Sequence, residues 1–238
     1  MPADHLQILH WNIHSWRDMD GARNVDAVFD LIHDVDPAVV SLVEVDESWK
    51  GSPALGWLAN RLGYSWIFAP TFEYGRDTPA GGFGNALLTK LPILVVRQRQ
   101  LLWPIRLYDG TEPSECRSVV LAKLGVPSAP LWVGSTHLPR EDADARTAAL
   151  NRLTGIIGDL DSHWLICGDF NTPASTWLDS NNQVAAFPQP AQPTYPTVQP
   201  SEPIDYCIAS PRLPIEARVL TVAGSDHYPI LLSCTVPA

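Results

Sequence analysis

Asp169 and Asn171, two residues apart in the segment LICGDFNTP (165–173), are the side chains best suited by type and spacing to do chemistry. The apolar run that ends at Cys167 predicts a short buried strand. Because residues i and i+2 of a strand point to the same side, a carboxylate and an amide leave this strand tip together. Such a pair can accept a proton from a water molecule and hold that water in place. The alternative is a polar turn, in which Asp and Asn serve turn geometry alone.

Polar side chains close several other predicted strands in the same way. They are Asn12 after the strand at 6–11, Glu44 after 38–43, His137 after 131–136, Asp205 within 204–209, and Asp226 and His227 in the turn 224–227 before the strand at 228–234. Each one also has a simpler interpretation, as a turn residue, a carboxylate that faces solvent or a hydrogen-bonded structural histidine. Taken together, they form the inventory that a metal-assisted hydrolase needs.

The elements that must position these side chains are mostly strands. Apolar residues at i, i+3, i+4 and i+7 predict an amphipathic helix at 24–36, and further helices are predicted at 53–62 and 142–160. Additional strands are predicted at 64–69, 84–90, 93–102, 116–124 and 215–222, with loops at 70–83 and 103–110 and an irregular stretch at 172–203. This order favours two β-sheets packed face to face with helices outside, in a single domain over 1–238.

The composition argues against a strong nucleic-acid binder. The formal net charge of the 238 residues is −10, and lysine occurs only at positions 50, 90 and 123. Affinity for duplex DNA comes largely from Lys and Arg contacts to phosphates. The candidate arginines for such a patch lie on different segments: Arg97, Arg99, Arg106 and Arg140. We therefore predict weak or no binding to duplex DNA.

The cysteines and the apolar runs bear on the compartment. Cys116, Cys167, Cys207 and Cys234 form no CxxC pair and lie in apolar, strand-like contexts, so we expect four reduced and mostly buried thiols. No N-terminal run resembles a signal peptide, and no stretch approaches the length of a membrane span. These features predict a cytoplasmic, monomeric protein with no membrane partner.

Seven short motifs, in order along the chain, resemble those of the endonuclease/exonuclease/phosphatase superfamily. They are His10-Trp11-Asn12, Val43-Glu44, Gly84-Asn85-Ala86-Leu87-Leu88, Ser135-Thr136-His137-Leu138, Gly168-Asp169-Phe170-Asn171, Thr194-Tyr195-Pro196 with Ile204-Asp205-Tyr206, and Ser225-Asp226-His227. The resemblance implies a four-layer α/β sandwich, with two packed mixed β-sheets flanked by helices. That architecture agrees with the one expected from the strand pattern.

The resemblance also implies hydrolysis of a phosphate ester with a divalent cation. The available ligands are carboxylates and amides without a thiolate cluster, which favours Mg²⁺ or Mn²⁺. Glu44 is the expected principal metal ligand, with Asn12 and Asp226 near the ion or its waters.

The other site residues are expected to handle water and phosphate. Asp169 would orient and activate the attacking water, and Asn171 would hold that water or the phosphate. His227 would contact a non-bridging oxygen, with Asp205 bonded to its other nitrogen to fix the tautomer. His137 would stabilise developing charge or protonate the leaving oxygen.

Two positions depart from the family pattern and bear on the substrate. Pro203 stands where a basic residue often precedes the aspartate of Ile-Asp-Tyr, and Ala149 stands where a glutamine often follows the helix arginine, here Arg146. Neither change removes a catalytic group. A small phosphoester is the favoured substrate, and a metal-dependent nuclease acting on DNA or RNA is the alternative. A non-catalytic binding module on this fold would be expected to lack site residues, and an unrelated α/β protein would match the motifs only by chance.

Overall fold

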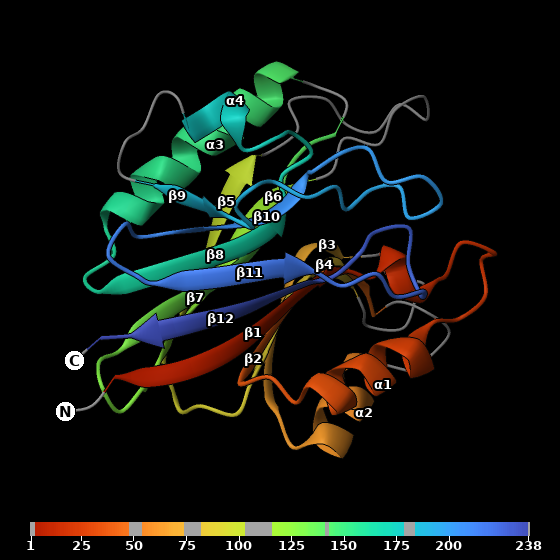
Figure 1. Ribbon diagram of the computed structural model, residues 1–238, viewed down its shortest axis with the longest axis horizontal. Helices are drawn as coiled ribbons and strands as arrows, with labels where there is room; N and C mark the ends of the chain where they lie inside the picture. Colours follow the sequence, from red (N-terminus) through yellow and green to blue (C-terminus); the bar gives the residue numbers. More distant parts are fainter. Residues whose placement is uncertain are drawn as a thin grey trace.

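Two six-stranded sheets pack face to face in the computed structural model, which describes residues 3–47, 54–73, 82–102, 116–140, 143–178 and 184–237 (Figure 1). The first sheet has the order β11 (Ile215–Val219), β12 (Ile230–Val236), β1 (Asp4–Asn12), β2 (Val39–Asp46), β4 (Gly82–Thr89) and β3 (Ser65–Glu73). The second has the order β5 (Ile93–Leu102), β6 (Arg117–Leu124), β7 (Leu131–His137), β8 (His163–Asp169), β10 (Asp205–Ala209) and β9 (Ala185–Phe187). Both sheets are mixed, because β1 pairs with β2 and β7 pairs with β8 in parallel, whereas the other pairs are antiparallel.

The helices cover the outer faces of the two sheets, as Figure 1 shows. α1 (Val25–Val35) and α2 (Ala54–Leu62) pack their apolar stripes, among them Val28 and Leu58, on the first sheet. α3 (Ala143–Gly158) and the short α4 (Ser175–Leu178) pack on the second sheet through residues such as Leu153 and Trp177. A third apolar cluster fills the space between the sheets. The expected four-layer sandwich is therefore confirmed.

Strand β1 illustrates how alternation positions the site. Leu9 and Trp11 belong to the cluster beneath α1 and α2, whereas Ile8 belongs to the cluster between the sheets. His10 and Asn12 share the parity of Ile8, so they also point toward the second sheet. Both are almost fully buried, at 0% and 1% exposure. The carboxyl end of β1 thus directs polar groups into the interface between the two sheets.

Some expected boundaries differ from those of the structure. β3 continues to Glu73, so residues 70–73, expected as loop, pair with β4, with a register shift after Pro70. The irregular stretch 172–203 contains α4 and β9, which are too short to produce a periodic pattern. β11 ends at Val219 and β12 begins at Ile230, slightly inside the expected limits. The expected loop at 103–110 lies outside the described residues.

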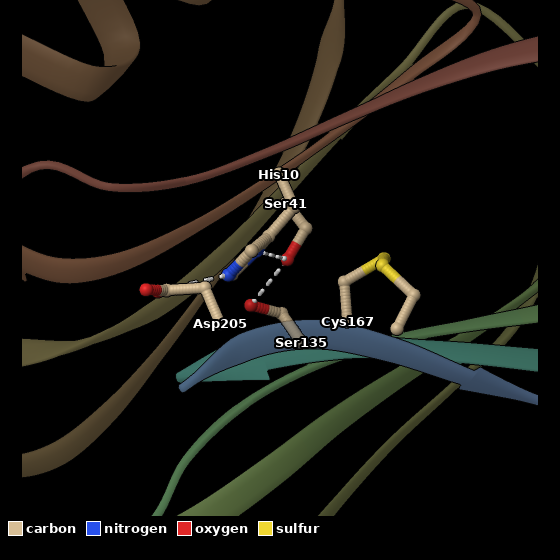
Figure 2. The surroundings of a disulfide bond; sticks show 6 residues. His10, Ser41, Ser135, Cys167 and Asp205 are labelled. Atoms are coloured by element: carbon tan, nitrogen blue, oxygen red, sulfur yellow. Dashed lines mark hydrogen bonds and ion pairs between the residues drawn. A yellow bond between two sulfur atoms is a disulfide. The ribbon is translucent and has the colours of Figure 1, made fainter. Parts of the chain in front are cut away.

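The prediction of four reduced cysteines is wrong for two of them. Cys167 on β8 and Cys207 on β10 form a disulfide (Figure 2), and Cys116 and Cys234 take no part in it. The reason is tertiary: the two residues lie directly opposite each other on antiparallel strands and are 40 residues apart in sequence, so no local motif reveals the pair. Disulfides persist more readily in oxidising compartments than in the cytoplasm. The cytoplasmic location therefore stays a prediction, and so does the monomeric state. Within the described residues, none of the helices combines the length and the hydropathy that a membrane span requires.

Candidate active site

The polar ends of β1, β2, β7, β8 and β10 meet at one rim of the sandwich. Asn12 lies at the centre of this rim, where its Nδ2 donates to Glu44 Oε1 and to Asp169 Oδ2, at 3.1 Å each. Asn12 and Glu44 belong to the first sheet and Asp169 to the second. The site therefore spans the interface between the sheets, and residues 157 positions apart in sequence come into direct contact.

Glu44 reaches the rim because β2 is irregular there. The register between β2 and β4 shifts between Leu42 and Val45, and Glu44 has a φ of 57°, in the left-handed region. A bulge of this kind inserts an extra residue and re-aims its side chain. Left-handed backbone is uncommon for residues other than glycine and is concentrated at functional sites. The side chain of Glu44 is 22% exposed, so its carboxylate reaches the open side of the rim.

The turn after β8 holds Asp169 and Asn171 in a fixed relation. The backbone N–H of Asn171, whose φ is 50°, donates to Asp169 Oδ1 at 2.9 Å. Asn171 Nδ2 donates to Leu138 O at 2.9 Å and lies 3.1 Å from His137 Nε2. Phe170, between them in sequence, stacks on Tyr206 with ring centroids 4.0 Å apart. The aromatic anchor and the hydrogen bonds together fix both polar side chains at the strand tip.

His227 and Asp205 form a short, buried polar contact within the site. His227 Nδ1 lies 2.7 Å from Asp205 Oδ2, which also accepts from Thr194 Oγ1 at 2.6 Å. Because a carboxylate only accepts, His227 Nδ1 is the donor. The other ring nitrogen, Nε2, lies 3.7 Å from Asp169 Oδ2. The Nδ1 edge of the imidazole is therefore held by the buried Asp205, and the Nε2 edge faces Asp169.

Asp226 enters the rim beside Glu44. Ser225 Oγ donates to Asn12 O at 2.7 Å and ties the turn before β12 to the end of β1. His14 Nδ1 lies 3.4 Å from Asp226 Oδ2 and 3.9 Å from Glu44 Oε2. All eight residues singled out in the sequence as catalytic or metal-binding thus gather in one connected group.

Burial and neighbouring charges shift the pKa values of the two buried aspartates of the site in opposite directions. Burial, reinforced by the charge of Asp205, raises the pKa of Asp169 to about 7. Burial would also raise the pKa of Asp205, but the charge of His227, its hydrogen bond to Asp205 and the nearby His10 ring hold that pKa well below its ordinary value. Burial disfavours the imidazolium of His227, yet the charges of Asp205 and Asp169 outweigh it and raise the pKa of His227 to about 10. At neutral pH the pair is therefore an imidazolium beside a carboxylate.

The pKa of His137 shifts in the opposite direction to that of His227. Burial, followed by the positive charges of Arg117 and His227, lowers its pKa well below the ordinary value, so the ring is neutral. A neutral ring whose Nε2 accepts from Asn171 Nδ2 carries its proton on Nδ1. His137 Nε2 also lies 3.6 Å from Asp169 Oδ2. In this arrangement the neutral ring helps to hold the Asn171 amide.

The carboxylates of the rim fit a hard divalent cation. Ligand atoms of Glu44, His137 and Asp169 lie within 4.8 Å of one another, and Asp226 lies beside Glu44 across His14. Several carboxylate oxygens in a partly exposed group suit Mg²⁺ or Mn²⁺. Asn12 contributes differently, because its Oδ1 accepts from the backbone N–H of His14 at 3.1 Å and its Nδ2 faces the carboxylates. Direct ligation by Asn12 would require its amide group to be reversed.

Two histidines near the site were not assigned a role from the sequence. His14 is 43% exposed in its side chain and begins the short 3-10 helix η1 (His14–Trp16), where three consecutive residues have positive φ values of 49°, 54° and 60°. His10 is fully buried behind the rim. The sequence does place both of them on the same side as Asn12, because residues 10, 12 and 14 are each two positions apart. Alternation alone assigns neither a function.

Comparison with solved structures identifies close relatives of the fold. The chain superposes on an endonuclease/exonuclease/phosphatase from Beutenbergia cavernae with a TM-score of 0.76 and 19% identity, covering 98% of this chain and 72% of that one. A mannosyl-6-phosphatase from Bacteroides thetaiotaomicron gives 0.78 and 14%, covering 96% and 99%. TDP2 from C. elegans gives 0.71 and 15%, covering 97% and 75%. No curated protein sequence matches this chain.

The sequence itself also matches a protein family over most of its length. The model of the Endonuclease/Exonuclease/phosphatase family matches residues 9–227, a span that begins just before Asn12 and ends at His227. Members of this family are metal-dependent phosphoesterases and nucleases, and the rim described above holds the acidic and histidine groups that such chemistry uses. This chain belongs to the Endonuclease/Exonuclease/phosphatase family and is a hydrolase of phosphoester bonds.

Proposed function

We propose that this protein hydrolyses a small phosphoester by in-line attack of an activated water molecule, with Mg²⁺ or Mn²⁺ as cofactor. The observation that carries the proposal is the environment of Asp169. It is a carboxylate, 2% exposed, with a pKa near 7, in contact with Asn12 and close to His137 and His227. A general base works best when its pKa lies near the working pH. An aspartate with these properties suits the removal of a proton from water.

The surrounding side chains divide the remaining roles. Asn171 holds the water or the phosphate, with its amide fixed by Leu138 O and the neutral His137. His227 presents its Nε2–H to a non-bridging phosphate oxygen, while Asp205 balances the imidazolium charge. A neutral His137 has no proton on the nitrogen that faces Asn171, so we assign it the positioning of that amide and not protonation of the leaving oxygen.

Glu44 is proposed as the principal metal ligand, with Asp226 and Asn12 near the ion or its waters. The two carboxylates approach the same His14 nitrogen, at 3.9 and 3.4 Å. When bound, a divalent cation neutralises charge on the phosphate and lowers the pKa of coordinated water. Glu44 and Asp226 would hold that cation on the open side of the rim, beside the base.

The preference for a small substrate rests on the distribution of positive charge. Arg97 and Arg99 lie on the edge strand β5, where Arg97 stacks on Trp132 at 4.6 Å, and Arg106 lies outside the described residues. Arg140 lies beside Tyr195, whose ring is 4.6 Å from that of His227. Over the part of the chain that the structure describes, Arg97 and Arg99 lie on a separate segment from Arg140 and the three do not form the continuous phosphate track of a polymer binder, and the net charge of the sequence is −10. An arginine next to the reactive centre suits a compact phosphoester.

The deciding experiment is a substrate panel with Mg²⁺, with Mn²⁺ and with chelator. The panel contains phosphomonoesters, phosphodiesters, duplex DNA, single-stranded DNA and RNA, and it includes sugar phosphates because of the fold likeness to a mannosyl-6-phosphatase. Asp169→Asn is the site variant, and Asp161→Asn, at an exposed position just before the start of β8, is the matched control. We expect metal-dependent turnover of a small ester, lost in Asp169→Asn only. A higher kcat/KM on DNA or RNA would establish a nuclease instead, and no turnover on any substrate would refute the proposal.

A further inference from the structure

His10 lies behind the rim, and none of the roles above uses it. Its side chain is fully buried between the sheets, two residues before Asn12. Figure 2 shows the ring pointing from β1 toward Asp205, with Ser41 and Ser135 along its other edge. A buried imidazole is costly to desolvate unless its polar atoms find partners. The contacts of its two nitrogens therefore indicate what the residue does.

A chain of hydroxyl groups fixes the orientation of the His10 ring. Leu42 O can only accept, so Ser135 Oγ donates to it, at 3.2 Å. Ser41 Oγ donates in turn to Ser135 Oγ, at 2.9 Å. Because each hydroxyl has one proton, the 3.0 Å contact between His10 Nδ1 and Ser41 Oγ has Nδ1 as the donor. The chain runs from β1 through β2 to β7, and it leaves Nε2 as the nitrogen that can serve another group.

Among the residues that the structure describes, neither His10 Nε2 nor Asp205 Oδ1 has a hydrogen-bond partner. The two atoms face each other at 3.8 Å, and both side chains are fully buried. The other carboxylate oxygen, Oδ2, already accepts from Thr194 and His227. Asp205 Oδ2 is thus held by Thr194 and His227, whereas Oδ1 faces the Nε2 edge of His10. At 3.8 Å this contact is longer than a hydrogen bond, so its effect is to limit the rotation of the carboxylate.

We propose that His10 is a positioning residue that holds Asp205 in the orientation in which Oδ2 engages His227. A partial rotation of the carboxylate about its Cβ–Cγ bond would carry Oδ2 out of line with His227 Nδ1. The ring of His10, fixed by its hydrogen bond to Ser41, lies 3.8 Å from Oδ1 and would hinder that rotation. The proposal rests on the proposed function in one respect: the consequence for turnover assumes that His227 acts on phosphate. The geometric consequence, a fixed His227–Asp205 hydrogen bond, does not depend on it.

Two substitutions at position 10 distinguish a side chain that holds Asp205 in place from one that only fills space between the sheets. In His10→Gln the side-chain amide reaches about as far as Nε2 and can contact Asp205. In His10→Asn the amide reaches only about as far as Nδ1, so it can contact Ser41 but leaves a gap at Asp205. A role in holding Asp205 predicts that Gln rescues and Asn does not. A role in anchoring β1 to Ser41 alone predicts the reverse, and a role as filler predicts effects that follow the loss of thermal stability.

The first readout does not require activity. A hydrogen bond from an imidazole N–H to a buried carboxylate gives a downfield proton resonance, which can be assigned to His227 by its loss in His227→Gln. We expect this resonance to persist in His10→Gln and to be lost or strongly broadened in His10→Asn. Should His10→Asn fail to fold, Ser41→Ala removes the anchor of the ring and is expected to broaden the same resonance. An unchanged resonance in every folded variant would overturn the proposal.

The second readout is steady-state kinetics on the best ester of the panel, with melting temperatures measured alongside. We expect kcat to fall about 10- to 100-fold in His10→Asn, the loss typical of side chains that orient a functional histidine, with KM nearly unchanged. His10→Gln should stay close to wild type. Equal losses in the two variants, or losses that track melting temperature, would overturn the proposal. If wild-type protein turns over no ester, the proposed function fails, and the resonance still decides the role of His10.

Discussion

The negative charge of Asp205 is the most informative feature of the site to remove, because it raises the pKa values of both His227 and Asp169. Asp205→Asn keeps an oxygen that can accept from His227 Nδ1 and from Thr194, but it removes the negative charge. Asp205 is the largest of the influences that raise the pKa of His227. It is also, after burial, the largest influence that raises the pKa of Asp169. The substitution should therefore lower both pKa values.

The size of the effect follows from how far the pKa of His227 is raised. Its pKa is raised from 6.5 to about 10, which at about 1.4 kcal/mol per pH unit corresponds to roughly 5 kcal/mol favouring the imidazolium from all its neighbours together. Because the folded pKa is raised, this stabilisation is fully present below pH 6.5 and is lost as the pH rises through about 10. Without Asp205, burial disfavours the charged ring and a large part of this energy is lost. We expect a neutral His227 over much of the range above pH 7.

The assay is the pH dependence of kcat/KM for both proteins at one saturating metal concentration. The wild-type rate should rise as Asp169 ionises, near pH 7, and fall as His227 loses its proton, near pH 10. Metal binding moves both limbs to lower pH in both proteins. In Asp205→Asn the limbs should move further toward acid, and the rate at pH 8 should fall roughly 100- to 1,000-fold, the typical cost of losing a charge-stabilising donor. An unchanged alkaline limb, with the rate at pH 8 within a few-fold of wild type, would refute the reasoning.

Three further results are expected. Glu44→Gln should keep the fold and lower turnover by orders of magnitude at any Mg²⁺ concentration; turnover of both proteins measured over a series of Mg²⁺ concentrations tests this, and near-wild-type activity at saturating metal would remove Glu44 from the site. Replacing Cys167 and Cys207 together by Ala should lower the free energy of unfolding by up to about 4 kcal/mol, since the bridge closes a loop of 40 residues; denaturant melts measure it, and an unchanged midpoint under oxidising conditions would contradict it. Duplex DNA affinity, measured in Ca²⁺ to slow cleavage, should be weak with a shallow salt slope, whereas tight binding with a steep slope would make a nuclease the leading interpretation.

Local patterns in the sequence were sufficient to predict the architecture and to select the polar residues at the strand ends. Alternation in β1 places His10 and Asn12 on the side of Ile8, and the apolar stripe of α1 identifies the face that covers the first sheet. These properties depend on residue spacing along a single element. Glu44, at the end of an apolar strand, could be selected for the same reason.

Contacts between segments that are distant in the sequence could not be predicted from such local patterns. The bulge that re-aims Glu44 arises from the pairing of β2 with β4, and it has no marker in the Val-Glu-Val sequence around it. The disulfide requires Cys167 and Cys207 to be directly opposite across β8 and β10, a register that is set by the whole sheet. The two cysteines appear in the sequence as ordinary apolar strand residues, as do Cys116 and Cys234.

The two buried aspartates show where the sequence alone reaches its limit. Asp169 and Asp205 both occupy strand ends, and the motifs around them identify both as members of the site. Only the tertiary structure gives the pKa values of Asp169 and Asp205 opposite shifts. The physical reason is partnership in a medium of low dielectric constant: Asp205 receives a hydrogen bond from His227 at 2.7 Å, whereas Asp169 lies 3.7 Å from the same ring and next to a second carboxylate. A difference of this kind depends on distances between β8, β10 and the turn before β12, and these distances exist only in the folded chain.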